Sequence, residues 1–153
     1  MKIYLLIASL LIFTTGFAQD FIGKKKIADG YYNSFDFYKA AAMYEQLLKS
    51  SPYDLELHLK LATIYDHLND SQGAERCYFF LVNRKEVKPE YLLSYAQALS
   101  RNGKYDKALI YYQKYKDVRP QDTRGDSFSQ AYKHMNQFYK DSASFHIKKA
   151  PFS

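Results

Sequence analysis

Residues that could carry out chemistry are few in this chain and stand far apart. Its four histidines, at positions 58, 67, 134 and 146, lack the spacing of metal ligands. Asp54 and His58 are four residues apart and would share a helix face, where we expect a solvated pair and not a catalytic one. The sequence contains neither a nucleophile elbow nor a Gly-rich phosphate loop. We therefore expect no enzyme, no metal and no cofactor.

The elements that must position the remaining polar residues repeat every 34 positions. Three columns keep one residue type in all copies: Ala28/Ala62/Ala96, Ala40/Ala74/Ala108 and Tyr44/Tyr78/Tyr112. Others keep a large apolar or aromatic residue: Ile27/Leu61/Tyr95, Tyr31/Tyr65/Leu99 and Leu47/Leu81/Tyr115. A fixed period of this size indicates a stacked array of helix pairs. Alanine at the shared positions would let two helix backbones approach closely while the aromatic rings fill the space beside them.

The period and the order of these positions resemble the tetratricopeptide repeat (TPR). Repeat 1 carries the pattern in full, apart from the Trp that the family favours first: Lys24, Ile27, Ala28, Tyr31, Ala40, Tyr44 and Pro52. The resemblance implies an all-α fold, a TPR α-solenoid of three helix-turn-helix repeats with a C-terminal capping helix. Cys77, the single cysteine, lies in an apolar column with Met43 and Tyr111, so we expect a small buried hydrophobe and not a reactive thiol.

We expect the chain to divide into three segments. Residues 1–18 have the pattern of a secretory signal peptide, because Lys2 precedes an apolar run and small residues precede a cleavage site ahead of Gln19. Residues 19–140 form the TPR domain, with repeats at about 21–54, 55–88 and 89–122 and a capping helix at 126–139. Residues 141–153 are a flexible tail or the truncated start of a β-propeller. The mature protein is then expected in the periplasm, with outer-membrane association left open.

Turn and capping residues predict where the helices begin and end. We expect helices at about 21–33, 37–50, 52–68, 71–84, 89–101 and 105–118. Ser51 and Pro52 would start the third of these, and Pro89 would start the fifth. Gly103 stands where the repeat favours glycine, and Phe35 stands in the same column of the first repeat.

The order of parts also resembles the N-terminal region of large OmpA-family outer-membrane proteins. In these proteins a signal peptide and a TPR block precede a β-propeller and a peptidoglycan-binding domain, and some members serve type IX secretion. The matching stretches here are residues 4–19, 28–32, 89–99, 122–125 and 145–148. The resemblance implies an envelope compartment. The resemblance does not imply anchoring to the cell wall, because the family's peptidoglycan-binding part has no counterpart in this sequence.

Binding would occur on the first helix of each repeat, which lines the concave face in TPR arrays. The register places these residues in that groove: Lys25, Asp29, Tyr32, Glu56, Leu59, Thr63, Asp66, His67, Glu90, Leu93, Gln97, Ser100 and Arg101. The carboxylate clamp of chaperone-binding TPRs is kept only at Lys25, since Asp29, Thr63, Glu90 and Ser94 occupy its other places. Capture of an acidic C-terminus is therefore not expected, and the mixed groove favours a polar peptide or a protein loop.

Two classes of function remain open at this point. The first is a non-catalytic periplasmic scaffold for protein–protein interaction, which would belong to an outer-membrane or type IX secretion assembly. The second is a cell-wall-associated structural protein or a truncated remnant of a larger OmpA-family protein. The net charge of +6 suits an acidic partner, but the lysines are dispersed, so no nucleic-acid partner is expected. The sequence does not decide the oligomeric state.

Overall fold

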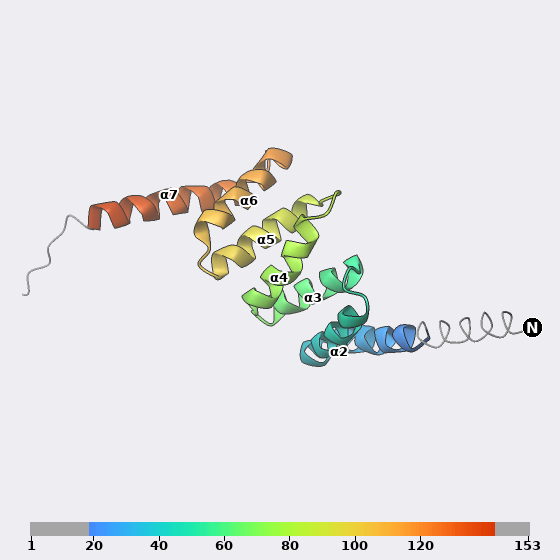
Figure 1. The fold of residues 1–153 in the computed structure, drawn as a ribbon. Coiled ribbons are helices and arrows are strands. Elements are labelled where there is room, and N and C mark those ends of the chain that lie inside the picture. Colours follow the sequence, from blue (N-terminus) through green and yellow to red (C-terminus); the bar gives the residue numbers. More distant parts are fainter. Residues whose placement is uncertain (1–18, 143–153) are drawn as a thin grey trace, which may run out of the picture. The chain divides into compact units, whose positions relative to one another are not determined.

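The computed structural model describes residues 19–142, leaving aside the side chains at 136, 138, 139 and 142. The regular elements of this part of the chain are all helices, joined by turns, and it contains no strand (Figure 1). A first helix covers residues 19–33. It is followed by α2 (Phe37–Ser50), α3 (Leu55–His67), α4 (Ser71–Val82), α5 (Pro89–Arg101), α6 (Tyr105–Val118) and α7 (Arg124–Ser142). The predicted signal peptide and most of the predicted tail lie outside the described residues.

The helices form two compact units, divided between Lys85 and Glu86. In unit 1, α2 packs against α3 and α3 packs against α4. In unit 2, α5 packs against α6 and α6 packs against α7. Among the helices that the structure describes, none combines the length and apolar character needed to cross a membrane.

Aspartates begin three of the helices, because a carboxylate before the first turn accepts a hydrogen bond from a free backbone amide. Asp36 and Asp70 stand 34 positions apart and accept from the amides of Lys39 and Gly73. Asp54 does the same for the amide of Leu57, at 3.1 Å. The prediction that Ser51 caps a helix starting at Pro52 was therefore wrong. Residues 51–54 form a separate turn, in which the Asp54 amide donates to the Ser51 carbonyl.

The turn inside each repeat has one residue in the left-handed backbone region. Phe35, Asn69 and Gly103 have φ values of 61°, 56° and 72° and stand 34 positions apart. Glycine adopts this conformation freely and Asn tolerates it, whereas a bulky side chain there costs roughly 1–2 kcal/mol. The turn geometry is therefore shared by all repeats, although the first repeat forms it with an unfavourable residue.

The alanine columns lie in the core of the helix packing, as the sequence predicted. Every alanine of the two invariant columns is fully buried. The tyrosines of the third invariant column are buried as well, with at most 6% of their surface exposed. Cys77 is also fully buried, and burial raises the pKa of its thiol to about 12. The expectation that Cys77 is a small buried residue is therefore confirmed.

Ile27 departs from its column. Leu61 and Tyr95 are buried, but 53% of the surface of Ile27 is exposed. Within the described residues no helix precedes the one that carries Ile27. The repeat pattern alone overestimated its burial.

Helix α7 covers one side of α6 and is longer than the predicted helix at 126–139. The Phe128 ring stacks on Tyr112, with centroids 4.3 Å apart and planes at 23°. Gly125 allows this approach, since a Cβ there would lie 3.1 Å from the Tyr112 carbonyl oxygen. Lys116 pairs with Asp126 at the start of the helix. These contacts let α7 shield the α6 surface that a further repeat would otherwise cover.

Candidate functional site

The first helix and α3 of unit 1 together present a face of charged and aromatic side chains. We call it the helix-A face and define it by Lys25, Asp29, Tyr32, Glu56 and Lys60. The Lys25 ammonium lies 2.8 Å from a Glu56 carboxylate oxygen, and the Lys60 ammonium lies 3.9 Å from an Asp29 oxygen. Lys60 also lies 4.1 Å from the centroid of the Tyr32 ring. Four predicted groove residues are thus brought together, along with a lysine that the sequence reasoning missed.

The charges of the helix-A face balance, with two ammonium groups against two carboxylates. The hydrogen bond to Glu56 holds the pKa of Lys25 above its ordinary value. Asp29 also accepts a hydrogen bond from the hydroxyl of buried Tyr44. Burial, followed by this bond, raises the pKa of Tyr44. Because its charges are internally satisfied, the face is suited to a partner with few net charges and many hydrogen-bonding groups.

A spacing of 31 residues would have identified Lys60. The pairs Lys25–Glu56 and Glu45–Arg76 are each separated by 31 positions. Asp29 and Lys60 have the same separation. This separation of 31 residues is about one helical turn shorter than the 34-residue period. A side chain therefore contacts a residue one turn before the position that corresponds to it in the next repeat. Oppositely charged residues 31 positions apart are therefore the sequence signal that would have identified Lys60.

Other predicted groove residues in unit 1 make local contacts. The Thr63 hydroxyl donates to the Leu59 carbonyl at 3.0 Å, and the Leu59 side chain is half-buried. Asp66 accepts a hydrogen bond from the Tyr78 hydroxyl at 2.7 Å. These residues extend the helix-A face along α3.

His67 contacts the second helix of the first repeat. Its ring is exposed and stacks on Phe37 with centroids 4.5 Å apart and planes at 4°. His67 therefore joins the end of α3 to the start of α2.

In unit 2 the predicted residues differ in exposure. Glu90, Gln97 and Arg101 are exposed, and Arg119 lies 3.4 Å from a Glu90 oxygen. The Ser100 hydroxyl donates to the Ala96 carbonyl at 2.9 Å.

Leu93 is only 4% exposed, so its assignment to the groove was wrong. Six of the 13 residues of α5 are buried. The apolar stripe of this helix is therefore wider than a single face, and it takes in the position that the register assigned to the groove.

His58 is part of the core, and the expectation of a solvated pair with Asp54 was wrong. Only 8% of its surface is exposed. Its Nε2 lies 3.0 Å from the Pro52 carbonyl oxygen, and its ring stacks on Phe80 at 3.6 Å between centroids. Asp54 instead caps α3. In this structure His58 therefore contributes to packing and Asp54 to helix capping.

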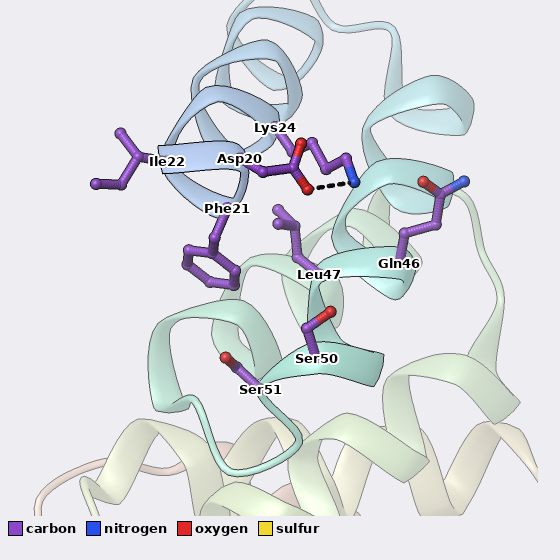
Figure 2. Close-up of a pocket in the computed structure, with 8 residues that line it drawn as sticks. All are labelled: Asp20, Phe21, Ile22, Lys24, Gln46, Leu47, Ser50 and Ser51. Carbon is purple, nitrogen blue, oxygen red and sulfur yellow. Dashed lines mark hydrogen bonds and ion pairs between the residues drawn. The ribbon is translucent and has the colours of Figure 1, made fainter. Parts of the chain in front are cut away.

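A pocket of about 500 Å³ lies between the first helix and α2. Figure 2 shows its lining, in which Asp20 and Lys24 form an ion pair at 2.7 Å. The other lining residues are Phe21, Ile22, Gln46, Leu47, Ser50 and Ser51. The two charges satisfy each other and lie on one helix, so the lining offers no pair of groups aligned for catalysis. None of these residues was predicted as a site.

The described residues contain no group of three or more His, Cys, Asp or Glu side chains that could hold a metal ion. Lysines and carboxylates of the helix-A face are joined to each other and not grouped by sign. The arrangement can bind through hydrogen bonds and ion pairs, and it has no evident nucleophile with an adjacent base.

Comparison with solved structures identifies the fold. The chain is similar to the first TPR of Spaghetti (RPAP3) bound to the HSP90 peptide SRMEEVD, with a TM-score of 0.60 and 19% identity over 74% of this chain and 94% of that one. It is also similar to MamA, with a TM-score of 0.64 and 14% identity over 74% of this chain and 66% of that one.

A third similar structure is the type III secretion chaperone SycD of Yersinia enterocolitica in complex with a peptide of the translocator YopD. Its TM-score is 0.58 and its identity 19%, over 74% of this chain and 92% of that one. No protein-family model and no curated protein matches the chain. At these identities the comparisons establish the fold, which is an all-α TPR fold as the sequence predicted.

Proposed function

We propose that this protein is a non-catalytic TPR scaffold that binds a protein or peptide partner through its helix-A face. The observation that carries the proposal is the face itself, in which hydrogen-bonding groups from the first helix and α3 lie side by side on a TPR fold. Two structures of similar fold hold peptides, one from HSP90 and one from YopD. The partner that fits this face is a polar segment of low net charge, because the lysines are already neutralised by Glu56 and Asp29.

We place this scaffold in the periplasm as part of the same proposal. Support comes from residues 1–18, where a lysine, an apolar run and small residues form the pattern of a cleavable signal peptide. The stretches shared with OmpA-family proteins favour an outer-membrane or type IX secretion assembly as the setting. Fractionation of the native host, with mass spectrometry of the N-terminus, tests this proposal. A mature chain that starts near Gln19 in the periplasmic fraction is expected, and an uncleaved cytoplasmic chain would refute it.

Site-specific photo-crosslinking tests the binding face. A photoreactive amino acid at Thr63, on the helix-A face, should yield a discrete crosslinked protein in the native host. The matched control is Gln72, an exposed residue of α4 in the same unit, which should give no such product. Equal crosslinking from both positions would contradict binding through the helix-A face.

A substitution distinguishes specific binding from accidental proximity. Thr63→Arg places a long cation among the balanced charges and should abolish the crosslink from a probe at Leu59. Gln72→Arg adds the same group to an exposed helix position elsewhere and should leave that crosslink unchanged. Both variants should keep wild-type helicity, which circular dichroism measures.

A cell-wall-associated structural role is the second candidate, favoured by the net charge of +6 and the likeness to wall-anchored proteins. Sedimentation with purified peptidoglycan separates the two, because a scaffold alone should remain in the supernatant. Propeller-like coding sequence directly downstream would identify the chain as a remnant of a longer OmpA-family protein.

A further inference from the structure

The first helix stands at the end of the chain that the proposed export would create. Cleavage after Ala18 makes Gln19 the first residue, with a free α-amine on the helix that covers residues 19–33. Gln19 and Asp20 are exposed, whereas Phe21 is half-buried and lines the pocket beside α2 (Figure 2). The new terminus therefore combines an exposed α-amine with the side-chain amide of the same residue.

A positive charge at this terminus is unfavourable. The first amides of a helix carry the positive end of its dipole, so an ammonium group beside them is repelled. The neighbouring carboxylate of Asp20 is already bonded to the Lys24 ammonium, at 2.7 Å. The helix end therefore favours the neutral amine, which is the nucleophilic form.

We propose that Gln19 of the exported chain cyclises to pyroglutamate. The α-amine nitrogen attacks Cδ of its own side chain, and the new C–N bond closes a five-membered lactam. The bond between Cδ and the side-chain nitrogen breaks, and that nitrogen leaves as ammonia with the proton lost by the amine. The reaction consumes no oxidant, reductant or second substrate. Cyclisation depends on the export and cleavage proposed above, because only cleavage frees the amine.

The product fits the start of the helix. The lactam ring closes on the backbone nitrogen, as the ring of proline does, and proline is favoured at the first position of a helix. The nitrogen of this residue needs no partner within the helix, because the first four amides of a helix have none. Cyclisation therefore removes the charge and leaves the packing of Phe21 unchanged.

The modification protects the helix that carries much of the helix-A face. An aminopeptidase requires a free α-amine, and the two exposed residues at the terminus of the uncyclised chain make that amine accessible. Further trimming would remove Phe21 from the pocket and shorten the helix ahead of Lys25 and Asp29. A lactam nitrogen is not a substrate for these enzymes, so the cap preserves this end of unit 1.

Mass spectrometry of the chain purified from its native host tests the proposal. The intact mass, recorded without digestion, should be lower than that of the mature sequence by the mass of one ammonia. Fragmentation should place this loss at Gln19. Treatment with pyroglutamyl aminopeptidase should remove the lactam and expose a free α-amine on Asp20.

Gln19→Asn is the matched control, because attack of the α-amine on the shorter side-chain amide would require a strained four-membered ring. This variant should be cleaved at the same place and keep its free α-amine. An aminopeptidase of broad specificity should remove residues from the variant and leave the wild-type chain at full mass. Equal trimming of the two chains would overturn the protective role.

The position of the mature terminus separates this proposal from the proposed export. A chain that begins at Gln19 with a free α-amine overturns cyclisation and leaves export standing. A chain that retains residues 1–18 overturns both. A chain cut at another position overturns only the cyclisation of Gln19.

Discussion

Two glycine-to-alanine substitutions in unit 1 should change stability in opposite directions. Gly30 is exposed and lies within the first helix, and a Cβ there would have no neighbour within 4 Å. Gly73 is buried in the first turn of α4, and a Cβ there would lie 2.7 Å from Tyr65 Cγ and 2.7 Å from Asp70 Oδ2. Both residues are in helices, so the intrinsic preference for alanine is similar at the two sites. The difference between them is steric.

For Gly30→Ala the expected effect is a gain of about 0.5–1 kcal/mol in the free energy of unfolding, the usual advantage of alanine inside a helix. For Gly73→Ala the same gain is opposed by two losses. Moving the Tyr65 ring away from the new methyl group is overpacking, which costs about 1–3 kcal/mol. Moving the Asp70 carboxylate weakens its bond with the Gly73 amide, now 2.9 Å long, and loss of such a cap costs about 1 kcal/mol. The net expectation is a destabilisation of roughly 1–3 kcal/mol.

Moving the Tyr65 ring would also disturb the hydrogen bonds of its hydroxyl group. Its hydroxyl donates to Glu45, which also pairs with Arg76. Burial, followed by the bond to Glu45, raises the pKa of this hydroxyl. Displacing the ring therefore disturbs a network that joins α2 to α3 and α4.

Urea unfolding followed by far-ultraviolet circular dichroism measures both effects. Because the two sites lie in one unit, their midpoints can be compared directly. The reasoning fails if Gly73→Ala is as stable as the wild type, or if Gly30→Ala is destabilised to the same extent. Gly73→Ser, with a Cβ in the same place, should repeat the loss and exclude an effect special to alanine.

Three further results follow from the structure. Tyr44→Phe removes the hydrogen bond to the Asp29 carboxylate and should lower the free energy of unfolding by about 1.5–3 kcal/mol, measured in urea; an unchanged midpoint would show that this bond contributes nothing. Burial raises the pKa of Cys77 from near 9 to about 12, so unfolding releases a proton in that range and stability should fall as pH rises from about 9 to 12. Cys77→Ala should reduce the slope of urea midpoint against pH, and an unaltered slope would contradict this. Phe128→Ala removes the stack on Tyr112 and should accelerate amide hydrogen exchange in α7 while leaving unit 1 protected; equal acceleration in both units would contradict the local role of the stack.

The sequence alone determined the features that recur at the 34-residue period. The alanine columns and the tyrosine column are buried in every repeat, and the turn column that favours glycine has a positive φ in every repeat. A small residue is favoured where helices pack together, so the alanines at 28, 62 and 96 were enough to predict buried positions. The all-α TPR fold follows from these columns.

The residues of the helix-A face were only partly predictable. Lys25, Asp29, Tyr32 and Glu56 were identified from register, but Lys60 was missed because its partners are set by a separation of 31 residues and not 34. The 31-residue separation depends on how the helices of two successive repeats pack together. It therefore cannot be read from the pattern of a single repeat.

Burial at single positions was decided only by tertiary structure. His58 is buried because the fold brings the Phe80 ring and the Pro52 carbonyl into contact with its ring. Leu93 is buried because α5 is covered over much of its circumference, while Ile27 is exposed although Leu61 and Tyr95 of the same column are buried. A repeat sequence specifies the features that every copy shares, and the particular neighbours of each copy determine the rest.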